Sequence, residues 1–194
     1  GIESNIINYL DHNNKAYKDL KFIEQNVIGV NSLDLVFEFK DKSDLPLWEK
    51  LYNLIGFEQD ILKYQEKTSV VSINSFIIEL YSLMMSKYEI PDKHTYERIY
   101  DIMLENFSFF ITRNLNIEKN IYKIQYMCPM FDIEALNKMD SHLNSLTKKV
   151  NNFKFIFDVT GFQHFNVSIY QYIFTTFSKS FLLTFLIIYL CMLL

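Results

Sequence analysis

Histidine and cysteine, the residues best suited to bind a metal or act as a nucleophile, are scarce in this 194-residue chain. The four histidines are His12, His94, His142 and His164. No two of them lie within reach on one helix, and neither an H-x-x-x-H nor an H-E-x-x-H pattern occurs. A metal site would need distant segments to meet. We therefore expect no metal site, and we interpret these histidines as solvated or locally hydrogen-bonded.

Cys128 precedes Pro129 at the end of an expected strand, and Cys191 lies in an apolar tail. A catalytic thiol needs a neighbouring base and an electropositive setting. The sequence around Cys128 supplies neither, so we expect a small, half-buried residue there. Two cysteines cannot form a disulfide framework, and they leave the redox compartment open.

Two pairs of carboxylates stand close together in the sequence, Asp132 with Glu134 and Glu97 with Asp101. The second pair has helical spacing on the polar side of an expected helix, where a solvated face explains it. A glycosidase-type pair forms in space rather than in sequence, so that alternative stays open. The chain has neither a Gly-rich phosphate loop nor a G-x-S-x-G elbow. We therefore expect no enzymatic activity and no cofactor.

Composition narrows the class of protein further. The chain has a net charge of −4 and only Arg98 and Arg113 as arginines, which argues against a nucleic-acid partner. A hydrophobic content of 49% excludes a disordered chain. The length suits one domain, or at most two small ones.

Aromatic residues are abundant, with 18 Phe and 13 Tyr, and most of them should belong to the core. An apolar group close to the C-terminal tail is a candidate to line a path for a hydrophobic substrate. This group is Phe162, Phe165, Ile169, Tyr172, Ile173 and Phe177, and the first four are the candidate path residues. Residues 165, 169, 172 and 173 share one helical face. Ordinary packing of these side chains against a sheet is the alternative, and the pattern favours it.

Hydrophobic periodicity predicts the elements that must position these residues. Alternation at Leu33, Leu35, Phe37 and Phe39 predicts a half-buried strand. Three more strands are expected over 68–73, 121–127 and 153–159. Spacing of three and four residues predicts helices over 14–28, 47–64, 76–84, 95–114, 132–150 and 165–180.

The order of these elements contains two β-α-β units. Two such units in one compact chain predict an α+β fold with a split, ferredoxin-like layer. The helices between the two units, over about 74–116, are then an insertion into that layer.

The C-terminal residues 181–194 carry no charge and have no polar face. Fourteen helical residues rise about 21 Å, whereas a bilayer core needs about 20 residues. A buried core helix and a re-entrant segment are alternatives. We expect instead the start of a truncated transmembrane helix over 179–194, following a domain that covers 1–178.

Several stretches together resemble one known family. They are residues 1–10, 18–24, 29–37, the Asp-Val-Thr-Gly turn at 158–161, and 178–186. This combination is similar to the extracytoplasmic porter domain of resistance-nodulation-division (RND) exporters, in the branch of hydrophobe exporters and MMPL-like proteins. The turn at 158–161, which leads through a helix into an apolar span, is the most specific part.

The resemblance implies proton-driven export of lipids or other hydrophobic compounds across the inner cell membrane, with 1–178 on the extracytoplasmic side. It also implies partners: the remaining membrane helices, a paired porter domain, the bilayer and a hydrophobic substrate. The proton-carrying acidic residues of the family lie in membrane helices, and 159–194 contain no acidic residue. The alternative hypothesis is a membrane-tethered α+β module that assembles a complex without transport.

Overall fold

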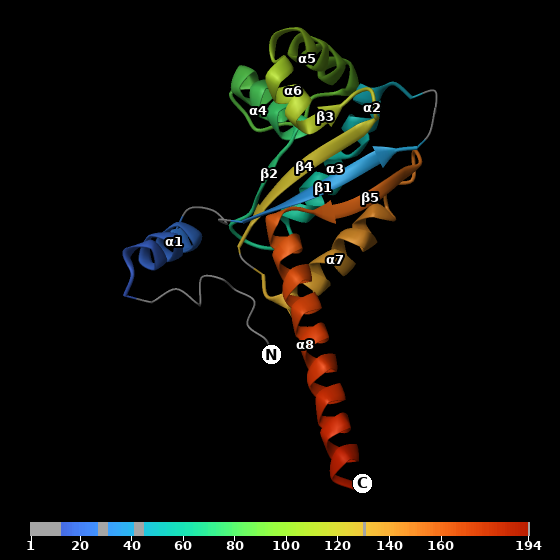
Figure 1. Ribbon diagram of the computed structural model, residues 1–194. Coiled ribbons are helices and arrows are strands. Elements are labelled where there is room, and N and C mark those ends of the chain that lie inside the picture. Colours follow the sequence, from blue (N-terminus) through green and yellow to red (C-terminus); the bar gives the residue numbers. More distant parts are fainter. Residues whose placement is uncertain (1–12, 27–30, 41–44, 130, 194) are drawn as a thin grey trace.

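The computed structural model describes residues 13–26, 31–40, 45–129 and 131–193 (Figure 1). Its strands are β1 (Asn31–Phe39), β2 (Ser69–Val71), β3 (Leu115–Asn116), β4 (Ile121–Cys128) and β5 (Phe155–Thr160). Its helices are α1 (Lys15–Asn26), α2 (Leu47–Asn53), α3 (Ile55–Leu62), α4 (Ile73–Met85), α5 (Lys93–Asn106), α6 (Ser108–Asn114), α7 (Ile133–Thr147) and α8 (Phe162–Leu193).

The sheet is antiparallel, with the strand order β2-β4-β1-β5, and β3 pairs with the free part of β4. β4 lies between β1 and β2, while β1 lies between β4 and β5. Each β-α-β unit is therefore split by a strand of the other unit, which is the ferredoxin-like arrangement. The predicted α+β fold is confirmed.

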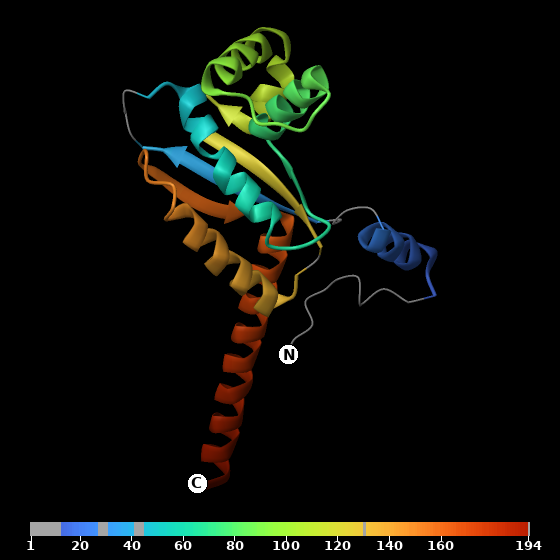
Figure 2. The ribbon, with the colours of Figure 1, turned by 180° about the vertical axis from the view of Figure 1, so that it is seen from behind.

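One face of this sheet is buried against helices, and the other is only partly buried. Leu35 and Phe37 of β1 are fully buried and lie opposite Ile124 and Tyr122 of β4. Helices α2, α3 and α7 cover this face (Figure 2). Phe37 packs at centroid distances of 5.1–5.3 Å against the rings of Phe57, Phe155 and Phe157. The opposite face is half-buried or exposed, and on β1 it carries Ser32, Asp34 and Glu38 together with the apolar Val36.

The helical insertion lies between β2 and β4 in the chain and consists of α4, α5, α6 and β3. It packs at one end of the sheet, and α8 leaves from the other end (Figure 1). The helix expected over 95–114 is broken at Phe107, whose φ of −126° and ψ of 41° are not helical. The helix expected over 47–64 is likewise divided at Leu54. β3 was not predicted, because a two-residue strand is too short to show an alternation.

Helix α8 is the longest element, with 32 residues. It begins three residues before the helix predicted over 165–180 and continues without a break through the apolar tail. It contacts β1 and β5 near its start and then extends away from the sheet (Figures 1 and 2). His12, the motif at 1–10 and the first two residues of the motif at 29–37 lie outside the described residues.

Candidate functional site

The predicted substrate-path residues lie on the first third of α8, where it leaves the sheet. Phe165 is 62% exposed, Ile169 is 38% exposed and Tyr172 is 73% exposed. Packing against the sheet is therefore wrong for Phe165 and Tyr172, although it was the favoured interpretation. The side chain of Phe162 lies outside the described part of the structure. The three described side chains form an apolar stripe on the exposed surface of α8.

A glycine turn connects the sheet to this helix. Gly161 has a φ of +108°, in the region that L side chains rarely adopt. A Cβ at this position would lie 3.0 Å from the Asp34 nitrogen and 3.1 Å from the Ser32 oxygen, both in the backbone of β1. The backbone N–H of Phe165 donates to the Gly161 carbonyl at 3.0 Å, which starts the helix. The turn motif at 158–161 therefore has a steric reason, since only glycine fits against β1.

A histidine–carboxylate pair joins the base of α8 to α7. His164 Nε2 lies 3.5 Å from Asp140 Oδ2, and both side chains are about one-third exposed. Burial raises the pKa of Asp140, and the neighbouring His164 opposes that rise. The pair borders a cavity of about 140 Å³ that Phe157 and Asp158 of β5 also line. Elements α7, β5 and α8 thus meet at one point, which we call the stalk junction.

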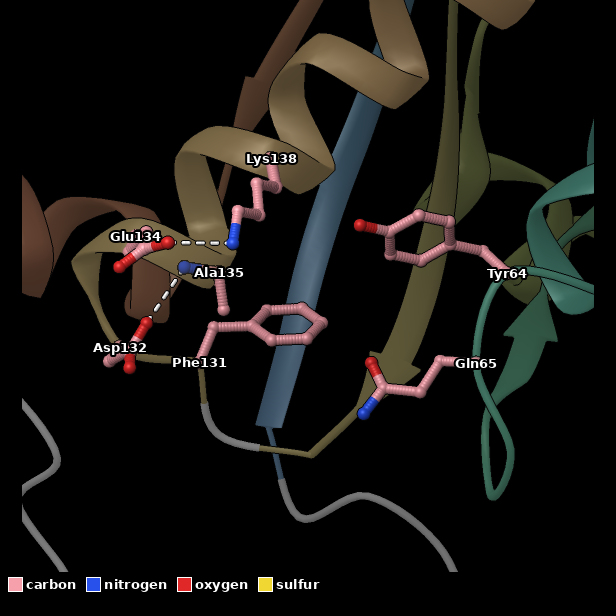
Figure 3. Close-up of a pocket in the computed structure, with 7 residues that line it drawn as sticks. All are labelled: Tyr64, Gln65, Phe131, Asp132, Glu134, Ala135 and Lys138. Atoms are coloured by element: carbon pink, nitrogen blue, oxygen red, sulfur yellow. Dashed lines mark hydrogen bonds and ion pairs between the residues drawn. The ribbon is translucent and has the colours of Figure 1, made fainter.

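A larger pocket, of about 580 Å³, lies between the α3–β2 connection and the start of α7 (Figure 3). Tyr64 and Lys138 face this space from opposite sides. Asp132 accepts a hydrogen bond from the Ala135 N–H at 2.7 Å and so caps α7. Glu134 pairs with Lys138 at 2.6 Å. Asp132 and Glu134, which stand close in the sequence, are thus each held by a neighbour at the start of α7.

Burial changes the chemistry of two further candidate residues, Cys128 and His142. Cys128 is fully buried, and burial raises its pKa to about 12, so its thiol stays protonated at neutral pH. His142 stacks on Tyr64 with ring centroids 4.3 Å apart, and burial lowers its pKa. Within the described ranges, no three His, Cys, Asp or Glu side chains are grouped so that they could hold a metal ion.

Glu58 of α3 is a titratable residue that sequence reasoning missed. It is 4% exposed and accepts hydrogen bonds from Ser72, Asn74 and Tyr122. Burial raises its pKa to about 7, although the three hydrogen bonds act in the opposite direction. A signal was present in the sequence. Glu58 lies four residues after Leu54 and three before Ile61, on the apolar stripe of its helix.

Residues 171–189 of α8 are long and apolar enough to cross a membrane. None of this segment is buried against the rest of the chain, so it is not a core helix of the domain. An apolar surface of this length is unfavourable in water and must be covered by lipid or protein. Comparisons with protein families, curated proteins and solved structures find no match to this chain.

Proposed function

We propose that this chain is the porter domain of a proton-driven RND-type exporter of lipids or other hydrophobic compounds, in the hydrophobe-exporter and MMPL-like branch. The observation that carries the proposal is the connection between β5 and α8. The last strand of a ferredoxin-like sheet passes through one glycine into an unbroken helix with an exposed apolar end. A domain built this way is fixed directly to a membrane-crossing element.

Lys179 suggests where the membrane begins. An ammonium at the bilayer centre costs about 2.5–3.5 kcal/mol or more, whereas near an interface it reaches the headgroups. We therefore put the interface near Lys179, with the apolar residues from Phe181 onward inside the bilayer and residues 171–178 of the candidate span 171–189 outside its hydrocarbon core. Residues 162–178 then form a stalk of about 25 Å between the sheet and the membrane. In this proposal the domain lies on the extracytoplasmic side of the inner membrane.

The stalk carries the apolar stripe of Phe165, Ile169 and Tyr172. A hydrophobic molecule that leaves the bilayer along α8 would meet this stripe before it meets water. A paired porter domain would close the path from the other side, and the other membrane helices would supply the proton-carrying carboxylates. The work of this chain would be to guide the substrate and to transmit movement between the membrane and the sheet.

A transport measurement in the source cells tests the proposal. Cells that lack the gene, and cells that carry Phe165→Ser with Tyr172→Ser, are loaded with the lipophilic dye N-phenyl-1-naphthylamine. We expect both to retain more dye than wild-type cells, and a protonophore to bring wild-type cells to the same level. Phe109→Ser is the matched control, since Phe109 is also exposed but lies on the insertion. Dye retention and exported lipids that do not change on gene deletion would contradict the proposal.

A second candidate function is a membrane-tethered module that assembles a complex without transport. It is favoured by exposed apolar side chains at the C-terminal end of α4 and just after it, namely Leu83, Met84 and Tyr88. Leu83 and Tyr88 also line a groove of about 600 Å³ there. Leu83→Ser with Met84→Ser would then reduce the size of the native complex on a blue-native gel, while dye efflux stays at the wild-type level.

A further inference from the structure

The contact between the insertion and the sheet is built around the buried carboxylate of Glu58. Ser72 Oγ donates to Glu58 Oε2 at 2.7 Å, and Tyr122 Oη of β4 donates to Oε1 at 3.0 Å. Ser72 also caps α4, because its Oγ accepts the Ser75 N–H at 2.9 Å. The first turn of the insertion and the central strand β4 thus share one carboxyl group.

Asn74 extends this network to the other helices that meet the insertion. Its Nδ2 donates at 2.8 Å both to Glu58 Oε1 and to the Leu51 carbonyl of α2. Its Oδ1 accepts the hydroxyl of Tyr96 from α5. One fully buried side chain of the insertion therefore binds α2, α3 and α5 together, and this set of contacts is what we call the insertion junction.

All the partners of the Glu58 carboxylate are neutral. The titratable groups that face the Glu58 carboxylate are Tyr122 from β4 and Tyr96 from α5. Tyr96 in turn lies near Tyr100 of its own helix and packs edge-on against Tyr52 of α2. Lys50 of α2 instead places its ammonium over the Phe39 ring. The ion pairs found among the described residues do not involve Glu58. A buried carboxylate without a cation is costly, so ionisation weakens the junction.

We propose that Glu58 is a proton-binding site that keeps the helical insertion closed on the sheet when it is protonated and lets the insertion open when it is ionised. The proton goes from water to the carboxylate, and the neutral carboxyl then donates to the Ser72 or Tyr122 hydroxyl, each of which can also accept. This proton-dependent closure needs only the buried carboxylate and the insertion. It would therefore operate whether or not the chain takes part in transport.

The direction of the effect follows from the two pKa values. Burial raises the pKa of Glu58 to about 7 in the closed form, against an ordinary 4.5 for a hydrated carboxyl. The closed form therefore holds its proton between pH 4.5 and 7, where the open form has lost it. Each rise in pH across this window favours opening, and by linkage the opening equilibrium rises about 70-fold between pH 5 and pH 8.

Hydrogen exchange of the α4 and α5 amides tests the proposal on the full chain in lipid nanodiscs at pH 5 and pH 8. After correction for the chemical exchange rate, we expect the opening equilibrium of the wild-type insertion to rise about 70-fold. Glu58→Gln should reduce this change to less than about threefold, because its amide does not titrate. Glu49→Gln is the matched control: Glu49 of α2 pairs with Lys93 of α5 at 2.8 Å across the same junction, but is not buried. It should keep the full change.

Two outcomes would overturn the proposal: a wild-type insertion whose opening does not change with pH, or a Glu58→Gln chain that opens 70-fold like the wild type. A titration of the wild type alone covers the case in which Glu58→Gln does not fold. In ¹³C NMR spectra of the labelled glutamate carboxyls, one signal should titrate with a midpoint near 7. If every glutamate titrated below about 5, the proposal would be wrong.

Discussion

The insertion junction and the stalk junction each contain a carboxylate, and the two carboxylates find their hydrogen-bonding partners in opposite environments. Glu58 is fully buried and is satisfied by three neutral donors. Asp140 is partly exposed and faces His164 at 3.5 Å. The buried network of neutral donors makes a strong contact, and the strength of that contact depends on whether Glu58 is protonated. A long, partly exposed histidine–carboxylate pair contributes little energy, so the stalk junction must depend on another feature.

That other feature is backbone geometry. Gly161 lies against the backbone of β1, and a side chain at this position would meet it at 3.0 Å. The insertion junction is therefore held by side chains and the stalk junction by the path of the main chain. Substitutions can separate the two.

The largest effect is expected at the stalk junction, from Gly161→Val. A positive φ costs a β-branched residue about 1–3 kcal/mol, and the contact with β1 adds to this. We expect a loss of about 3 kcal/mol or more in the free energy of unfolding, measured by urea titration with Trp48 fluorescence. Gly56→Ala is the control, since a Cβ there meets nothing within 4 Å. Its stability should stay the same or rise by up to about 1 kcal/mol. Equal losses in both variants would show that the turn has no special role.

The next effect belongs to Glu58 and depends on pH. The group has a raised pKa in the folded chain, so its stabilisation is complete below pH 4.5 and is lost as pH rises to about 7. By linkage this loss is on the order of 3 kcal/mol. Urea titrations at pH 4.5, 6 and 8 give the free energy of unfolding of the wild type and of Glu58→Gln. The loss is measured as the change with pH in the difference between these two free energies. A difference that stays constant with pH would remove the contrast between the two junctions.

Tyr122→Phe sharpens the same contrast, because it deletes one donor to Glu58 and leaves the ring in place. Hydrogen bonds to charged groups contribute about 1.5–3 kcal/mol and those between neutral groups about 1 kcal/mol. We expect a loss of about 2 kcal/mol at pH 8 and about half of that at pH 5. The two urea titrations that measure it should also show an unchanged slope. A larger loss at pH 5 than at pH 8 would contradict the neutral-donor description.

The smallest effect is expected from His164→Ala. The pair with Asp140 is partly exposed and long, so its removal should cost at most about 0.5 kcal/mol at pH 6. Thermal unfolding of the variant beside the wild type is sufficient to detect a larger loss. A loss above about 1.5 kcal/mol would mean that the pair, and not the glycine turn, holds the stalk junction.

The sequence predicts the fold well where one pattern covers a whole element. β1 alternates over its full length, and α7 repeats its apolar positions from Ile133 to Leu146, so both were placed within a few residues. The breaks at Leu54 and Phe107 were not predicted because the apolar spacing continues across them. Gly56 follows Leu54 by two residues but lies inside α3, so it does not mark the break itself. Short strands such as β3 are decided by their partner, here Tyr122 and Ile121 of β4, rather than by their own residues.

The site is harder to predict, for a physical reason. Gly161 belonged to a motif that the sequence shows, but the need for glycine arises from β1, which is more than a hundred residues away. Glu58 was overlooked because a carboxylate in an apolar stripe is explained only by its partners, which come from two other places in the chain: Ser72 and Asn74 at the start of α4, and Tyr122 in β4. The exposure of Phe165 and Tyr172 depends on the direction in which α8 leaves the sheet, and periodicity contains no information on that direction.

Helix α8 gives the domain a mechanical advantage. Its 32 residues make a rod about 48 Å long, so a tilt of about 10° at its root sweeps the tip through about 8 Å. Motions too slight to disturb the sheet become displacements comparable to the width of a helix at the other end. Conversely, when a force displaces the tip of α8, the sheet at its root moves by a smaller distance and experiences a larger force. The stiffness of this single rod therefore sets how faithfully either end follows the other.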